Sequence, residues 1–239
     1  MNKEALASEP TPPSDLNASA AAMELPQNAG PLTHGSPIFL VGMMGAGKTT
    51  IGRSLARVLH REFIDLDHEL ESRCGVRIPV IFEIEGEQGF RKRECQVLDD
   101  CTVQPNLVMA TGGGAVLAEE NRQALKSRGI VIYLRATVEE LYRRTNRDRN
   151  RPLLATPDPK ATLKSLLEMR EPLYEAVADV VVDTGTIPVS ALVANIVEQL
   201  RSVDKVIDRS AQSRPGNSSA SMRADFAASH TEENKPCTP

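Results

Sequence analysis

The sequence of 239 residues has no tryptophan, and phenylalanine, tyrosine and tryptophan together make up only 3% of it. Proteins that bind single-stranded nucleic acids commonly stack bases on such rings. The formal net charge of -4 also argues against general binding to nucleic-acid phosphates. We therefore expect no nucleic-acid partner, and we expect a core built from aliphatic side chains.

Cysteine is scarce as well, and long apolar runs are missing. The cysteines are Cys74, Cys95, Cys101 and Cys237, and no two of them have Cys-x-x-Cys spacing. This pattern favours reduced thiols in a cytoplasmic protein over a disulfide framework. No apolar stretch reaches the ~18 residues needed to cross a bilayer, so we expect no membrane partner.

The two ends of the chain differ in composition from the middle. Residues 1–36 are rich in Ala, Pro, Ser and Asn and contain no Arg, so they resemble neither a secretory signal nor a transit peptide. Residues 204–239 are also polar and rich in Ser and Ala. We expect both ends to be disordered extensions of a single domain at residues 37–203.

Between these ends, apolar runs typical of strands alternate with segments of helical spacing. The predicted strands are residues 38–41, 62–65, 106–110, 130–134 and 179–182. The predicted helices are residues 49–60, 67–100 with breaks near Gly75 and Pro79, 119–126, 137–144, 160–176 and 189–200. This alternation predicts a three-layer α/β fold, with a parallel sheet covered by helices on both faces. Ligands of such sheets bind at the carboxyl ends of the strands.

The first predicted strand is followed by Gly-Met-Met-Gly-Ala-Gly-Lys-Thr, beginning at Gly42. This is the phosphate-binding loop pattern, or P-loop, in its required place between a strand and a helix. Loop N–H groups and the helix N-terminus cradle phosphates, the lysine reaches the β- and γ-phosphates, and the threonine hydroxyl binds Mg²⁺. The predicted ATP-binding residues here are Gly45, Ala46, Gly47, Lys48, Thr49 and Thr50.

Two acids, Asp65 and Asp67, follow the second predicted strand. One interpretation is a helix N-cap, where Asp is favoured. The other is catalytic: one acid orients water on Mg²⁺ and the other accepts a substrate hydroxyl. The P-loop favours the second interpretation. Asp65 is the candidate for the Mg²⁺ side, because the strand at residues 107–110 carries no acid.

Three consecutive glycines, Gly112 to Gly114, follow the third predicted strand. They form either a flexible turn or a backbone that lies flat against a ligand. Arg91 and Arg170 each stand beside a small or rigid neighbour, although a lone arginine is usually a solvated surface charge.

An arginine-rich run leads into a segment interrupted by prolines. Its arginines are Arg143, Arg144, Arg147, Arg149 and Arg151. A nucleic-acid patch is one interpretation, but the run has no aromatic partners. We favour a mobile lid over the ATP phosphates, at residues 143–159.

Together, these motifs resemble the shikimate kinase family over residues 38–200. The resemblance rests on Gly-Met-Met-Gly-Ala-Gly-Lys-Thr-Thr-Ile-Gly, Phe-Ile-Asp-Leu-Asp, Gly-Phe-Arg-Lys-Arg-Glu, Ala-Thr-Gly-Gly-Gly, Arg-Pro-Leu-Leu and Arg-Glu-Pro-Leu-Tyr. It implies a five-stranded parallel sheet of order 2-3-1-4-5, as in nucleoside monophosphate kinases. It also implies transfer of the γ-phosphate of ATP to the 3-hydroxyl of shikimate, with one Mg²⁺ ion and a monomeric enzyme.

The resemblance further implies roles for residues at the acceptor. Asp67 corresponds to the catalytic acid that holds the shikimate hydroxyls. Arg91 and Arg170 correspond to the pair that grips the shikimate carboxylate. Gly112, Gly113 and Gly114 correspond to the backbone that contacts the ring substituents.

On the nucleotide side, Arg151 corresponds to a catalytic lid arginine that reaches the ATP phosphates, together with Lys48. Asp65 corresponds to the acid near the metal that Thr49 also binds. Ile187 lies where the family has an adenine-side residue.

The physical chemistry of the arginines agrees with an anionic acceptor. Two arginines without a counter-acid would make a costly positive pocket, and a carboxylate substrate would neutralise it. Two other functions stay open: another small-molecule kinase of gluconate or nucleotide type, and a non-catalytic nucleotide-binding module. Loss of Lys48 or Asp67 would have favoured the module, and both are present.

Overall fold

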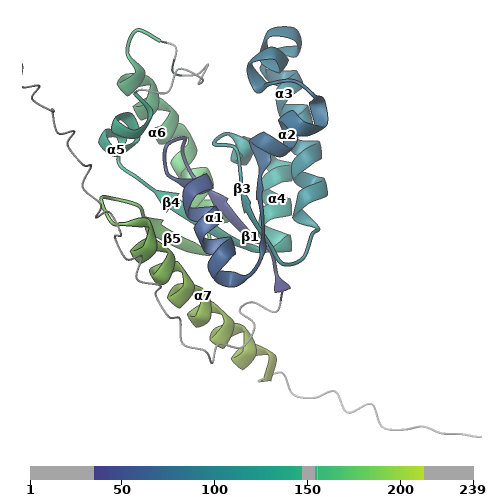
Figure 1. The fold of residues 1–239 in the computed structure, drawn as a ribbon, viewed down its shortest axis with the longest axis vertical. Coiled ribbons are helices and arrows are strands. Elements are labelled where there is room, and N and C mark those ends of the chain that lie inside the picture. Colours follow the sequence, from purple (N-terminus) through teal and green to yellow (C-terminus); the bar gives the residue numbers. More distant parts are fainter. Residues whose placement is uncertain (1–34, 147–153, 155, 213–239) are drawn as a thin grey trace, which may run out of the picture. The chain divides into compact units, whose positions relative to one another are not determined.

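The structure, a computed structural model, describes residues 35–146, 154 and 156–212, and it describes side chains as far as Ser202. They form a five-stranded parallel sheet of order β2-β3-β1-β4-β5, which confirms the predicted fold and strand order (Figure 1). The strands are β1 Ile38–Val41, β2 Glu62–Asp65, β3 Leu107–Ala110, β4 Ile130–Arg135 and β5 Val180–Asp183.

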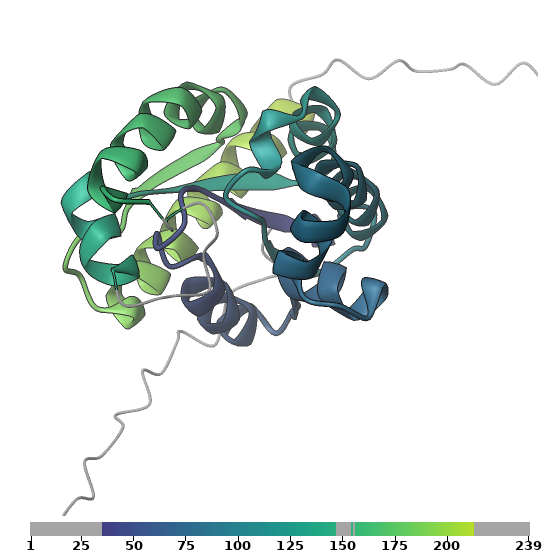
Figure 2. The ribbon, with the colours of Figure 1, turned by 90° about the horizontal axis from the view of Figure 1, so that it is seen from above.

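Helices cover both faces of the sheet. They are α1 Lys48–Leu59, α2 Leu66–Cys74, α3 Ile78–Thr102, α4 Glu119–Arg128, α5 Val138–Thr145, α6 Pro159–Val177 and α7 Val189–Gln212. Helices α1 and α7 pack together on one face, and α4 and α6 pack on the other (Figure 2). None of the helices in the described part of the chain is long and apolar enough to cross a membrane.

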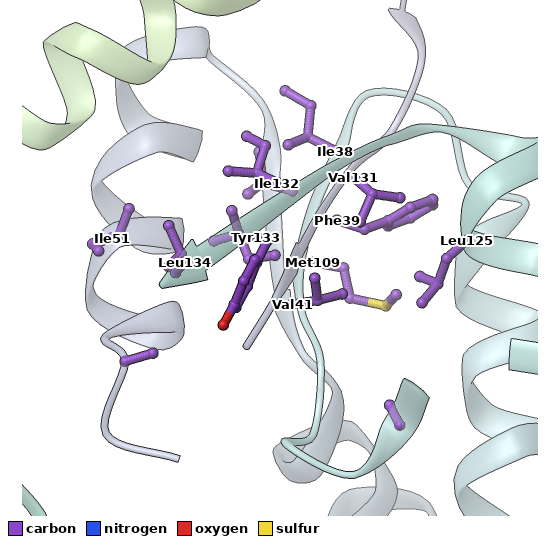
Figure 3. Packing of buried hydrophobic residues seen from close by; sticks show 14 of the residues in the cluster. Ile38, Phe39, Val41, Ile51, Met109, Leu125, Val131, Ile132, Tyr133 and Leu134 are labelled. Carbon is purple, nitrogen blue, oxygen red and sulfur yellow. The ribbon is translucent and has the colours of Figure 1, made fainter. Parts of the chain in front are cut away.

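The core lies on both sides of the central strands. All residues of β1 and β3 are buried, as their uninterrupted apolar sequences predict for a sheet covered on both faces. Side chains of β1 and β4 lie between Ile51 of α1 on one side and Leu125 of α4 on the other (Figure 3).

The register of the strands makes three of them end within one residue of the same level. Asp65 at the end of β2 pairs with Ala110 at the end of β3, and Ala110 pairs with Leu40 of β1. The three loops that follow these strands therefore leave the sheet side by side, which is the arrangement expected for a ligand site at the carboxyl edge.

Two helices differ from their predicted extents. Helix α7 continues to Gln212, past the expected domain boundary at Val203, because no Gly or Pro occurs between Ser190 and Pro215 to end it. Helix α3 has an interruption at Gly86, whose φ of 68° and ψ of -175° lie outside the helical region. This interruption was not predicted, since breaks were expected only near Gly75 and Pro79.

The predicted lid lies partly outside the described residues, which lack eight of its seventeen positions, Arg151 among them. Arg143 and Arg144, the first two residues of the expected lid, lie in the last turn of α5, within the helix predicted at residues 137–144. At its other end, α6 already begins at Pro159, since proline is tolerated in the first turn of a helix.

Helix α1 approaches the sheet closely at Gly52. A Cβ atom at this position would lie 2.6 Å from Cε2 of Phe63 in β2 and 2.9 Å from Cδ1 of Leu40 in β1. Both distances are shorter than packing allows, so the absence of a side chain lets the P-loop helix rest directly on two strands.

We predict that Gly52→Ala lowers the free energy of unfolding by about 1–3 kcal/mol through overpacking, although alanine favours a helix more than glycine does. Chemical denaturation measures the change. Ser54→Ala in the same helix is the matched control and should change stability by less than about 0.5 kcal/mol. A stabilising effect of Gly52→Ala would show that Phe63 and Leu40 can move to make room for a methyl group at this position.

Candidate active site

The P-loop joins β1 to α1 and is held by its own residues. Gly42 has a φ of 138°, and a Cβ there would lie 2.6 Å from the carbonyl oxygen of Leu134 in β4. Lys48 is the first residue of α1, and its Nζ donates hydrogen bonds to the carbonyl oxygens of Gly42 at 2.8 Å and Met43 at 2.9 Å. The lysine charge therefore lies within the loop that is expected to surround the phosphates.

A cavity of about 420 Å³ opens over this loop. Its lining contains Met44, Gly45, Gly47, Lys48, Thr49, Thr50, Asp65, Asp67, Thr111, Gly113 and Arg144. The predicted ATP-binding residues thus line one cavity, with two exceptions in the described part. Ala46 is buried in the loop, and Ile187 lies half-exposed in the loop between β5 and α7.

The two residues predicted to lie near the metal are in direct contact. Thr49 Oγ1 donates a hydrogen bond of 2.6 Å to Asp65 Oδ2, and Asp65 Oδ1 accepts one of 3.4 Å from the backbone N–H of His68. Asp65 is therefore the N-cap of α2, as one of its two interpretations predicted, and its other carboxylate oxygen contacts Thr49. A hydroxyl beside a carboxylate offers the oxygen ligands that Mg²⁺ prefers.

Mg²⁺ is usually bound by one or two carboxylates together with substrate phosphates and water, and rarely by a cage of protein ligands. The described residues contain no group of three or more His, Cys, Asp or Glu side chains that could hold a metal ion. The pair of Thr49 and Asp65 fits an ion that arrives with the nucleotide.

A second cavity, of about 410 Å³, lies beside the first. It is lined by Met44, Arg53, Asp65, Asp67, His68, Glu71, Arg77, Ile78, Pro79, Phe82, Phe90, Arg91, Glu94, Gly112, Gly113, Gly114 and Arg170. The structure thus brings together all the residues predicted to bind the acceptor. The two cavities share Met44, Asp65, Asp67 and Gly113, so their contents would meet beside Asp67.

The three glycines leave room for side chains of the site. A Cβ at Gly112 would lie 2.5 Å from Glu94 Oε1 and 2.9 Å from Asp67 Oδ1. A Cβ at Gly114 would overlap the guanidinium of Arg91. The glycine loop is therefore the packed floor of the cavity.

Arg91 has a counter-acid, which corrects the prediction of an uncompensated positive pocket. Its Nη1 donates a hydrogen bond of 2.6 Å to Glu94 Oε2, and its Nη2 lies 3.2 Å from Oε1 of the exposed Glu87. Glu94 is 1% exposed, and burial raises the pKa of its carboxyl group despite the nearby charge of Arg91. The sequence carried a signal for this pair, since Glu94 follows Arg91 by three residues on a predicted helix.

Arg170 lies on α6 and is 3% exposed. Its Nη1 donates a hydrogen bond of 3.2 Å to the carbonyl oxygen of Gly113. The Nε atoms of Arg91 and Arg170 and Oε1 of Glu94 are buried and have no hydrogen-bond partner among the described residues.

Arg144 is a residue of the nucleotide cavity that the sequence analysis assigned to the lid. Its Nη1 donates to the carbonyl oxygen of Gly45 at 3.3 Å and to Thr184 Oγ1 at 3.0 Å, and its Nη2 donates to the carbonyl oxygen of Gly185. Arg144 therefore fastens the P-loop to the loop that carries Ile187.

A P-loop cavity that shares an acidic wall with a second polar cavity, on a sheet of this strand order, defines an ATP-dependent kinase of small molecules. The sequence profile of the shikimate kinase family matches residues 44–201. The chain belongs to the shikimate kinase family.

Individual relatives are similar over most of the chain. A shikimate kinase of Bordetella pertussis is 63% identical over 201 residues, which are 84% of this chain and 95% of that protein. One from Cupriavidus pinatubonensis is 55% identical over 181 residues, 75% and 94% of the two chains. The structure of Acinetobacter baumannii shikimate kinase in complex with shikimate has a TM-score of 0.69 at 50% identity, covering 70% of this chain and 93% of that one.

We predict a pH-dependent stability difference between the wild type and Glu94→Gln. The raised pKa of Glu94 means that the folded chain binds a proton more tightly than the unfolded chain, so this group contributes stability at low pH that is lost as the pH rises through the folded pKa. The wild type should therefore gain stability relative to Glu94→Gln as the pH is lowered from 8 towards about 5. Urea denaturation at several pH values measures this, and a constant difference would contradict it.

Proposed function

We propose that the chain transfers the γ-phosphate of ATP to the 3-hydroxyl of shikimate, giving shikimate 3-phosphate and ADP. The observation that carries the proposal is the shared wall at Asp67, where a cavity suited to phosphates meets a cavity suited to a polar anion. The similarity to a shikimate kinase solved with shikimate supports the choice of acceptor.

The acceptor cavity suits a carboxylate that also carries hydroxyl groups. Arg91 and Arg170 both line it, and the planar guanidinium group can bind a carboxylate through two parallel hydrogen bonds. Asp67 lies in the first turn of α2, lines the same cavity and offers a hydrogen-bond acceptor for hydroxyl groups. A nucleotide acceptor would need a base pocket and further arginines facing its phosphate.

In the proposed reaction, Asp67 accepts a hydrogen bond from the 3-hydroxyl and orients it towards the γ-phosphorus. The new bond forms between this oxygen and phosphorus while the hydroxyl proton passes to Asp67, the bond from phosphorus to the oxygen bridging the β-phosphate breaks, and ADP leaves. Lys48 and the N–H groups of the P-loop stabilise the charge that builds on the transferred group.

The proposal includes one Mg²⁺ ion per site, held on the protein side by Thr49 and Asp65, which would neutralise phosphate charge when bound. It also assigns Arg151 to the ATP phosphates and Ile187 to the adenine side, as the family resemblance implies. A monomeric, cytoplasmic enzyme is part of the same proposal.

The test is ADP release in a coupled assay with shikimate as the acceptor, compared with quinate, gluconate and nucleoside monophosphates. We predict turnover with shikimate that exceeds turnover with the other acceptors. Lys48→Met is the matched control and should keep the fold but lose most turnover, since its charge at the β- and γ-phosphates is gone. Faster turnover of gluconate or a nucleotide would favour another kinase, and near-normal turnover of folded Lys48→Met would remove the role of that lysine.

A second prediction concerns Asp67. Asp67→Asn should lower kcat by ~10²-fold or more, because a neutral amide orients the attacking hydroxyl poorly and cannot take its proton. The affinity for ATP should change little. A variant with normal kcat and weakened ATP binding would place Asp67 on the nucleotide instead of the acceptor.

A further inference from the structure

Two stacked tyrosines lie beneath the active site, and only one of them reaches it. Tyr133 of β4 and Tyr174 of α6 have ring centroids 5.1 Å apart, and both are buried, with exposures of 1% and 0%. The hydroxyl of Tyr174 donates a hydrogen bond to the carbonyl oxygen of Gly113 and lies 3.6 Å from Sδ of Met43 in the P-loop. The hydroxyl of Tyr133 has no hydrogen-bond partner in the described part of the chain.

Gly113 connects three parts of the site, which are helix α6, the glycine loop and the P-loop. Its carbonyl oxygen accepts hydrogen bonds from Tyr174 and from Nη1 of Arg170, which lie four residues apart on the same face of α6. On the other side, a Cβ at Gly113 would lie 3.3 Å from the backbone nitrogen of Met44, so the glycine loop rests on the P-loop there. Arg170 is therefore connected through this carbonyl to the loop that rests on the P-loop.

The ring of Tyr174 is held from the sheet. It stacks on Tyr133, which pairs in the sheet with Val41, the residue before the P-loop. Burial raises the pKa of Tyr174 to about 12, so its hydroxyl stays protonated and remains a donor in neutral solution. A rigid ring with a permanent donor can fix the direction of the carbonyl that it contacts.

We propose that Tyr174 is a positioning residue for acceptor binding: its hydroxyl fixes the Gly113 carbonyl on which Arg170 rests, and so sets Arg170 at the right distance from the P-loop. The inference rests on the proposed function, in which Arg170 binds the acceptor carboxylate. Without the hydroxyl, the carbonyl keeps the hydrogen bond of 3.2 Å from Arg170 and loses the donor that holds it in place.

The experiment compares Tyr174→Phe with Tyr133→Phe. Each change removes one hydroxyl from a buried, stacked ring, so the pair is matched in chemistry and burial. For Tyr174→Phe we expect the KM for shikimate to rise about 3- to 10-fold, the range of one hydrogen bond, with the KM for ATP unchanged within about twofold. For Tyr133→Phe we expect both constants to stay within about twofold of the wild type. Thermal unfolding of both variants shows that each is folded.

A double-mutant cycle separates positioning from general loosening. In an Arg170→Ala background, Tyr174→Phe should raise the KM for shikimate by less than about twofold further, because the group that it positions is gone. An undiminished effect in that background, an equal rise in the KM for ATP, or the same loss in Tyr133→Phe would overturn the inference. A wild type that does not phosphorylate shikimate would refute the proposed function, whereas an active wild type and an unimpaired Tyr174→Phe would refute this inference alone.

Discussion

Strand β3 is hydrogen-bonded to β2 on one side and to β1 on the other, and this double pairing is the constraint on which the site depends. Because Asp65, Ala110 and Leu40 lie level, the P-loop, the glycine loop and the acids after β2 start from one line. A shift of β3 by one residue would exchange the faces of its buried side chains, so the core itself fixes this alignment. Asp67 lies two residues beyond the end of β2, so the alignment of β2 with β3 also places this acid beside the glycine loop.

Much of this arrangement could be predicted from the sequence, because each motif consists of residues that are consecutive in the chain. The P-loop is a continuous pattern, and the apolar strands with their following loops predict a parallel sheet with one functional edge. Strand pairing then brings Thr49 to Asp65 and the glycine loop to Asp67, although these segments lie far apart in the chain. The family resemblance supplied the strand order and the expected roles of Arg91 and Arg170 at the acceptor, which the spacing of residues does not determine.

The rest depends on how the helices pack, and the sequence does not show this directly. The acceptor arginines were expected to have no counter-acid, whereas the fold buries Glu94 against Arg91. Burying this carboxylate costs free energy that the ion pair with Arg91 only partly offsets. An acceptor carboxylate bound to Arg91 would interact with a guanidinium that already pairs with Glu94. Arg144 was predicted to be part of a basic lid because the sequence does not show its partners. These are Gly45, Thr184 and Gly185, which lie in two loops far from Arg144 in the chain.

The packed glycine loop has a consequence for how this site can change during evolution. A side chain at Gly112 or Gly114 would collide with Asp67, Glu94 or Arg91, so no single substitution there can reshape the floor without displacing a functional group. Another part of the cavity lining comes from Ile78, Pro79 and Phe82 in the first turns of α3, before the interruption at Gly86. New acceptor preferences would therefore arise by substitutions in that part of the lining, while the floor stays the same.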